Sequence, residues 1–404
     1  MRSFDITRLS EKLRCAGPGM PARLLISQNF PDFSAFWPRL GSLGEARCHV
    51  FQYAEIIQLR IDTVLAARQA TPFFVAVLDQ DEKPLLLAPF ALETRREKSG
   101  LIVDARVLSF LDGGLSDYNA PVLFPGVAAW NGRIARSVWG AIAAALPPFD
   151  IVEFEKMSDR VGDLSNPLFW LGKFRPGVFG HAVRFSYSWN EMERDLPHRD
   201  VWKKARFKKL GKLAIDVART PQEFDSIIEV LIAQKRRRYI ERNGVDGLER
   251  PGYLSYLRQS RLLASADGPA LLLALKIGDT IVATTLGWVA GRRYNGQFTT
   301  FEGGEWRPYS LGQLLMNKGM EWCFHNGVQI FDFGIGDDSY KRKICNVEVP
   351  LFYGQIPASF KGRMLVAKRE QGRLWRHYSR KAGAIIAKFG QRRPLRSQAK
   401  TWEI

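Results

Sequence analysis

The stretch GDDSYK, from Gly336 to Lys341, places two carboxylates, a phenol and an amine close together in the chain. A carboxylate can accept the proton of an attacking amine or hydroxyl, and a phenol can protonate a leaving group. We therefore predict Asp337 or Asp338 as a catalytic base, Tyr340 as the acid and Lys341 as a group that holds an anion. The alternative is that this cluster is only a structural loop and helix cap.

A turn of the type that binds phosphate lies upstream of this cluster. Apolar residues at helical spacing follow Ser310, so we predict a helix capped by Ser310 and Gln313, which form a capping box, and ended by Gly327. Backbone N–H groups at a helix start bind phosphate, and glycine lets the backbone come close to it. The predicted pyrophosphate-binding residues are Ser310, Leu311, Gly312 and Gln313.

The helix is flanked by two predicted strands, one containing NGQFTT (295–300) and one reading VQIFDFG (328–334). A helix between two strands indicates a crossover, which places the start of the helix at the edge of the sheet. A backbone N–H of the first strand could polarise the carbonyl of a bound substrate. Asp332 lies between two phenylalanines, so we predict a buried hydrogen-bonding residue rather than a base.

Both halves of the chain repeat one order of elements. Apolar runs on either side of 79–83 predict a hairpin, 129–150 predicts a helix, and the following run predicts a strand. In the second half, Thr220 to Gly244 predicts a helix with a Thr-Pro-x-Glu start. The remaining predictions are a strand at 181–189, a helix at 251–268, and three strands within 269–304 that turn at 277–279 and 290–293. This pattern predicts an α/β fold with a mixed sheet covered by helices.

The order of these motifs resembles a known family. YSLGQLL (309–315), FDFG (331–334) and GDDSYK resemble GNAT-superfamily acyltransferases associated with cellulose and exopolysaccharide biosynthesis, which are relatives of Fem-type aminoacyl transferases. The resemblance runs from Trp189 to Ile344, and GGLSDYNAPVL and LSNPL are similar to the N-terminal part of these proteins. The sequence departs from the family pattern in having Leu311 in place of a usual proline and Ile344 in place of an aromatic residue.

The resemblance implies tandem GNAT-like domains. Residues 1–180 would be a degenerate domain, 181–358 the acyltransferase domain and 359–404 a basic helical tail. Lys235 and Arg238 occupy basic positions that the family tends to fill, which implies that they bind substrate. The co-substrate would be acetyl-CoA or another acyl-CoA, without a metal. The acceptor would be an amine or hydroxyl of a carbohydrate or lipid-linked sugar in envelope or extracellular polysaccharide biosynthesis.

Two alternatives stay open. One is a Fem-type transferase that uses aminoacyl-tRNA, for which the basic segment 199–212 would grip RNA. The other is a catalytically inactive, nucleotide-regulated binding module that kept the fold. Direct acyl transfer needs no covalent enzyme intermediate, so a chain without a Ser-His-Asp or Cys-His arrangement is compatible with the enzymatic reading.

The net charge of +18 is concentrated in two places. Residues 360–404 hold 13 Lys/Arg against 2 Asp/Glu, and residues 199–212 hold 7 against 1. Such patches favour an anionic partner. We expect an anionic membrane surface or a solvated tail, and no nucleic acid. Arg392 and Arg396 have the spacing of a cyclic dinucleotide receptor, but the accompanying Asp/Asn-x-Ser-x-x-Gly pattern does not follow them.

The scattered cysteines and histidines argue against a metal site or a disulfide framework. The first 20 residues show no apolar core of a secretory signal, and the apolar runs are shorter than a membrane span. We therefore expect a cytoplasmic protein that could bind peripherally at the inner face of the membrane.

Overall fold

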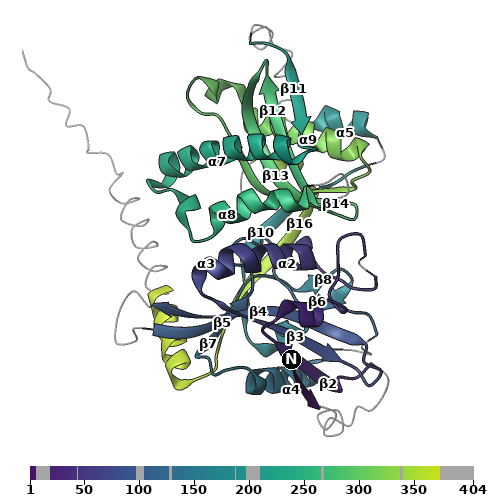
Figure 1. Ribbon diagram of the computed structural model, residues 1–404, viewed down its shortest axis with the longest axis vertical. Helices are drawn as coiled ribbons and strands as arrows, with labels where there is room; N and C mark the ends of the chain where they lie inside the picture. The colour runs from purple at the N-terminus through teal and green to yellow at the C-terminus, as the bar shows by residue number, and fades with distance from the viewer. Residues whose placement is uncertain are drawn as a thin grey trace, which may run out of the picture.

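The computed structural model describes residues 1–5, 19–42, 44–96, 104–126, 130–186, 188–196, 210–264, 268–336 and 340–373. Two α/β halves lie at opposite ends of an elongated molecule, and one mixed sheet runs through both (Figure 1). The predicted α/β class with a mixed sheet and helices is therefore confirmed.

The first half begins with antiparallel strands and continues into a helix between two parallel strands. Its main elements are β1 (Arg2–Asp5), β2 (Arg23–Ser27), α2 (Ala54–Arg60), α3 (Ala66–Arg68), β3 (Thr71–Leu78), β4 (Pro84–Arg96), β5 (Asp104–Phe110), β6 (Val122–Leu123), α4 (Gly132–Ala145), β7 (Ile151–Ser158), β8 (Arg160–Val161), β9 (Leu164–Ser165) and β10 (Phe174–Arg184).

The second half follows the same order. Its main elements are α5 (Trp189–Asp195), β11 (Leu213–Val217), α7 (Pro221–Asn243), α8 (Tyr253–Gln259), β12 (Ala270–Ile277), β13 (Thr280–Ala290), β14 (Arg293–Phe301), the 3₁₀ helix η8 (Gly304–Tyr309), α9 (Leu311–His325), β15 (Ile330–Ile335), α10 (Lys341–Ile344) and β16 (Val347–Pro357). Residues 360–373 then form a further helix.

Local sequence signals account for most of these boundaries. The Thr220 hydroxyl accepts the backbone N–H of Glu223, the Glu223 carboxylate accepts that of Thr220, and Gly244 ends α7 in the left-handed region. The predicted hairpin turns are confirmed, and Asn295 lies inside β14 as expected. The predicted helix at 251–268 is shorter than expected, because α8 gives way to a 3₁₀ turn (η7, Ser260–Leu263).

Each half contains one pair of parallel strands joined by a helix. β5 and β7 flank α4, and β14 and β15 flank α9. The predicted crossover around α9 is thus confirmed. Both pairs run side by side over three residue pairs: Val107↔Ile151 to Ser109↔Glu153 in the first half, and Arg293↔Ile330 to Asn295↔Asp332 in the second. Beyond those pairs the strands separate.

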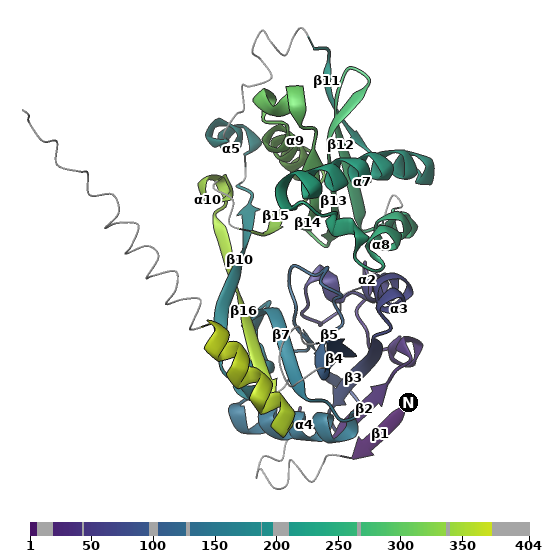
Figure 2. The same ribbon diagram turned by 90° about the vertical axis from the view of Figure 1, so that its left-hand side faces the viewer.

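The two halves exchange strands where they meet. The order of strands across the junction is β7-β16-β10-β15, so β16 completes the sheet beside β7 and β10 lies beside β15 (Figure 2). The predicted domain boundary at 180/181 falls inside β10. An apolar cluster at the junction contains Phe51 and Tyr118 of the first half together with Phe224 and Trp288 of the second. The halves therefore share buried apolar surface as well as strands.

Candidate active site

A cavity of about 510 Å³ opens where β14 and β15 separate. It is bounded by α7, β14, η8, the start of α9 and β15. The structure brings eight of the predicted site residues together around it, namely Lys235, Arg238, Ser310, Leu311, Gly312, Gln313, Tyr340 and Lys341. The other two, Asp337 and Asp338, lie outside the described residues.

A β-bulge at Gln297 bends β14 at the mouth of this cavity. The register with β13 shifts between Leu286↔Phe298 and Gly287↔Gly296, which leaves Gln297 as the extra residue. Its side-chain oxygen accepts hydrogen bonds from Trp288 Nε1 (2.7 Å) and the Tyr256 hydroxyl (3.1 Å). Its amide nitrogen donates to the carbonyl of Leu115 (2.6 Å) in the first half. The bulge is therefore held in place from both halves.

The start of α9 differs from the prediction. Ser310 adopts a left-handed backbone (φ 53°, ψ 42°), and its side chain makes no capping hydrogen bond to the described residues. The Gln313 amide donates instead to Asn317 Oδ1 at 2.9 Å. The predicted capping box is wrong because η8 runs directly into α9, whereas a capping residue needs an extended backbone. Ser310 therefore does not cap the first turn of α9, whose residues Leu311, Gly312 and Gln313 line the cavity.

Gly312 is required by close packing. A Cβ at this position would lie 2.8 Å from two ring atoms of Phe301, which is closer than real Cβ atoms approach. The Arg238 guanidinium packs on the same ring, 3.8 Å from its centre. Glycine therefore lets α9 approach β14 and the cation beside it.

Besides Lys341, four cationic side chains line the cavity: Lys235, Arg238, Arg242 and Arg307. Lys235 Nζ donates to the carbonyl of Thr299 at 3.3 Å. Burial, followed by the nearby charges of Arg238 and Arg242, lowers the pKa of Lys235 to about 8. Cations of like sign gathered at a helix start form a site suited to an anion with several phosphates.

Lys341 and Tyr340 close the cavity at the end of β15. The Lys341 side chain is buried, and its Nζ donates to the carbonyls of Phe333 (3.2 Å) and Ile335 (2.9 Å). The Tyr340 ring packs edge-on against Phe333. Lys341 therefore fixes the last residues of β15. Its role toward an anionic group, and that of Tyr340 as an acid, stay predictions.

Asp332 is the buried hydrogen-bonding residue that the sequence predicted. Its side chain is fully buried and accepts from the Tyr118 hydroxyl (3.0 Å), from Arg293 (2.5 Å) and from the backbone N–H of Gly334 (2.7 Å). These three donors occupy the two oxygens of the carboxylate. Asp332 lines the cavity and, through its hydrogen bond with Tyr118, connects β15 to the first half.

The sequence reasoning missed Asp117, which belongs to the loop after β5. A Cβ on Gly334 would lie 2.2 Å from Asp117 Oδ2, and Gly334 has a φ of 70°, so glycine is needed there on both counts. Burial raises the pKa of Asp117 to about 7 against the lowering effect of Lys156. Its charge also acts on Lys235 and Lys341, two residues that line the cavity. A carboxyl with a pKa near neutrality is suited to accept a proton.

Within the described residues, no group of His, Cys, Asp and Glu side chains is arranged to hold a metal ion. Likewise, none of the helices in the described ranges is both long and apolar enough to cross a membrane.

The comparisons with known proteins agree with this geometry. Residues 199–342 match the family model described as "Acetyltransferase (GNAT) domain". The crystal structure of FemX is similar over 80% of this chain and 95% of that chain, with 11% identity and a TM-score of 0.50, which supports the fold. No curated protein sequence matches the chain.

Two further solved structures are similar at lower scores. A tandem GNAT protein from the clavulanic acid biosynthesis pathway aligns over 83% of this chain and 99% of that chain, with 11% identity and a TM-score of 0.45. L-PGS from Bacillus licheniformis aligns over 78% of this chain and 96% of that chain, with 14% identity and a TM-score of 0.44. The family match assigns a GNAT acetyltransferase domain to residues 199–342, and the chain is an acyltransferase.

Proposed function

We propose that the chain moves an acyl group from acyl-CoA to an amine or hydroxyl of a sugar or sugar-linked acceptor, in the assembly of envelope or extracellular polysaccharide. One observation carries the proposal: four cations line one cavity together with the first residues of α9, and the carboxyl of Asp117 lies against Gly334, between the lining residues Phe333 and Ile335. These features suit a ligand that has phosphates at one end and a reacting group at the other.

The residues fit the phosphate groups of acyl-CoA. The first residues of α9, Leu311 to Gln313, line the cavity together with Arg238 and Arg307. When bound, acyl-CoA supplies the thioester carbon that the acceptor attacks. Lys235 would hold a phosphate, because its ammonium faces the same cavity and is charged below a pKa of about 8.

In the proposed transfer, Asp117 would act as the base and Tyr340 as the acid. The acceptor nitrogen or oxygen forms a bond to the acyl carbon and loses a proton, which Asp117 accepts. The bond from that carbon to sulfur breaks, and Tyr340 supplies the proton that the thiolate takes up. Lys341 keeps β15 in position, because it bonds the carbonyls of Phe333 and Ile335.

The first experiment is thermal unfolding of the full chain with acetyl-CoA and longer acyl-CoA. A ligand that binds only the folded state at about 100 times its Kd stabilises it by about 2.7 kcal/mol. Release of the CoA thiol is then followed with amino sugars and polysaccharide fragments as acceptors. The proposal fails if no acyl-CoA shifts the melting temperature, or if no sugar acceptor stimulates thiol release.

Aminoacyl-tRNA is the second candidate donor, because the cations at the cavity mouth would also suit the phosphates near an RNA 3′ end. The two donors are separated by direct competition. Binding of aminoacyl-tRNA that excludes acyl-CoA, falls steeply with salt and leads to transfer would favour the Fem-type reaction over acyl-CoA.

A further inference from the structure

The helix at 360–373 packs on the sheet of the first half through one face. Leu365 is buried in a small cluster with Ala105 and Val107 of β5 and Ile151 of β7. Gly362 sits directly against the carbonyl of Asp150, and the Ser359 hydroxyl donates to the Asp150 carboxylate at 2.9 Å. The helix is therefore part of the folded body, not an appendage to it.

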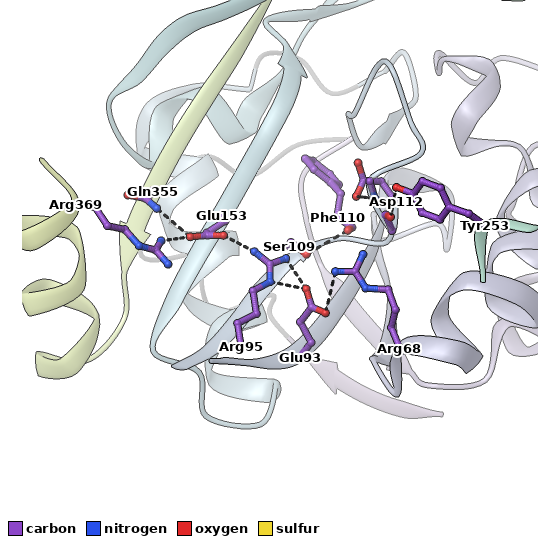
Figure 3. Close-up of polar contacts among 12 residues, drawn as sticks. Arg68, Glu93, Arg95, Ser109, Phe110, Asp112, Glu153, Tyr253, Gln355 and Arg369 are labelled. Carbon is purple, nitrogen blue, oxygen red and sulfur yellow. Dashed lines mark hydrogen bonds and ion pairs between the residues drawn. The ribbon is translucent and has the colours of Figure 1, made fainter. Parts of the chain in front are cut away.

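Ion pairs fix the same helix at its far end. Arg369 bonds the carboxylate of Glu153, which also accepts from Gln355 (2.9 Å) and Arg95 (2.5 Å) (Figure 3). Glu370 accepts a two-pronged hydrogen bond from Arg175 of β10 (3.0 and 2.9 Å). Because Glu153 is buried and bonded from three sides, these contacts hold the helix in one orientation.

The opposite face of this helix presents two large apolar side chains to solvent. Phe360 is 69% exposed and Met364 is 44% exposed. Residues four apart lie one above the other on a helix, so the two form one apolar strip. Arg363, also exposed, lies over the Phe360 ring, while Lys361 pairs with Asp150 at 3.5 Å. A basic helix with an outward apolar strip has the composition of an interfacial helix.

The sequence around this strip is strongly basic. From residue 360 to 404 there are 13 Lys/Arg and 2 Asp/Glu, together with Trp375, Tyr378, Phe389 and Trp402. Anionic lipid attracts basic residues near its surface, and aromatic side chains favour the interface between headgroups and acyl chains. Charge and apolar character thus point to the same partner.

We propose that the outer face of the helix at 360–373 docks on an anionic phospholipid surface, with Phe360 and Met364 entering the interface and the basic residues around them contacting headgroups. The helix is already ordered on the sheet, so docking requires no folding of this segment. A nucleic acid could also bind the basic residues through its phosphates, but it would give Met364 no apolar environment. This surface is separate from the cavity and does not depend on the proposed acyl transfer.

The test is sedimentation of the full chain with vesicles of phosphatidylcholine, alone or with about one third phosphatidylglycerol. Binding is expected only to the anionic vesicles, and it should weaken as salt rises above about 0.1 M, where charges are screened over about 10 Å. The double variant Phe360→Ser, Met364→Ser should bind at least about tenfold more weakly. Its melting temperature should match the parent, because both side chains are exposed.

Leu262→Ser is the matched control, since Leu262 is 70% exposed in the second half and lies outside the basic region. It should bind vesicles like the parent. Three results would each overturn the proposal: no binding to anionic vesicles at low salt, equal binding of the double variant, or tighter binding to duplex RNA than to anionic vesicles.

Discussion

The two halves share one arrangement of strands and a crossover helix, yet the cavity with the predicted site residues lies in the second half. In α9 the first residues line that cavity, and Ser310 provides no cap for them. In α4 the Asn131 side chain accepts the N–H groups of Arg133 (2.9 Å) and Ile134 (3.0 Å). The corresponding helix start in the first half is therefore occupied by the chain itself.

The two pairs of parallel strands, β14 and β15 and β5 and β7, also differ at the point where the strands separate. β14 carries the bulge at Gln297, whereas the register of β5 with β4 runs without a shift from Phe90↔Phe110 to Arg96↔Asp104. The rings of Phe110 and Phe154 lie 4.7 Å apart where β5 and β7 part. Packed aromatic rings thus occupy this part of the first half.

The loop that follows β5 explains what the first half contributes. Asn119 forms backbone hydrogen bonds with Lys156 and Ser158 of β7, while its neighbours Asp117 and Tyr118 reach β15. The acidic residues at the two strand separations are also alike, since Glu153 and Asp332 are both buried and both paired with arginine. The comparison shows that the loop after β5 brings Asp117 and Tyr118 of the first half into contact with β15 of the second.

The largest expected effect comes from Asp117→Asn, which tests whether the first half supplies the base. A positioned base contributes about 10²–10⁴-fold, or about 3 to 5 kcal/mol of barrier. We expect kcat to fall by that factor, with the affinity for acyl-CoA nearly unchanged. Asp112→Asn is the control, because Asp112 of the same loop pairs with Lys156 at 3.2 Å. It should lower stability more than turnover; equal kinetic losses in both variants would contradict the assignment.

The same residue predicts a pH dependence. Burial raises the pKa of Asp117 to about 7 in the folded state, above the ordinary value of 3.8 for an aspartate. Between these pH values the folded protein binds more protons than the unfolded one, so the free energy of unfolding should fall as pH rises. Turnover should rise over the upper part of this range as the base loses its proton. In Asp117→Asn both slopes should be reduced, as measured by denaturant titration and initial rates from pH 4 to 8.

Lys235→Met tests the phosphate end of the cavity. A hydrogen bond to a charged group contributes about 1.5 to 3 kcal/mol, so acyl-CoA should bind roughly 10 to 100 times more weakly at pH 7. The parent should lose affinity as pH rises through about 8, where Lys235 is deprotonated, and the variant should not. Lys276→Met, which removes a lysine paired with Asp216 on β11, serves as the control. An unchanged Kd for Lys235→Met would place the phosphates elsewhere.

The smallest expected effect is on stability, and it compares the first turn of α4 with that of α9. Asn131→Ala removes two hydrogen bonds to the first turn of α4 and should lower the free energy of unfolding by about 1 kcal/mol. Ser310→Ala removes no cap and should change it by less than about 0.5 kcal/mol. Chemical denaturation of both variants measures the difference. A larger loss for Ser310→Ala would mean that α9 is capped after all.

The helices, strands and turns could be predicted from neighbouring residues in the sequence. The arrangement of the candidate site depends on contacts between residues far apart in the chain. The Thr220 start and Gly244 end of α7 and the turns around β13 need only neighbouring residues, so the sequence contains them. Ser310 was misread because a 3₁₀ helix directly before it changes its backbone. Tyr118 and Asp332 are 214 residues apart in the chain, and no spacing rule connects them. The role of Asp117 therefore became visible only through its contact with β15.

The exchange of β10 and β16 has a consequence for synthesis on the ribosome. β7 ends at Ser158, but the strand that covers its edge begins at Val347, about 190 residues later. At about 5–20 residues per second, that edge stays open for on the order of 10–40 s after β7 emerges. Unpaired strand edges invite pairing with other chains. The exchange thus delays completion of the first half until β16 has been translated.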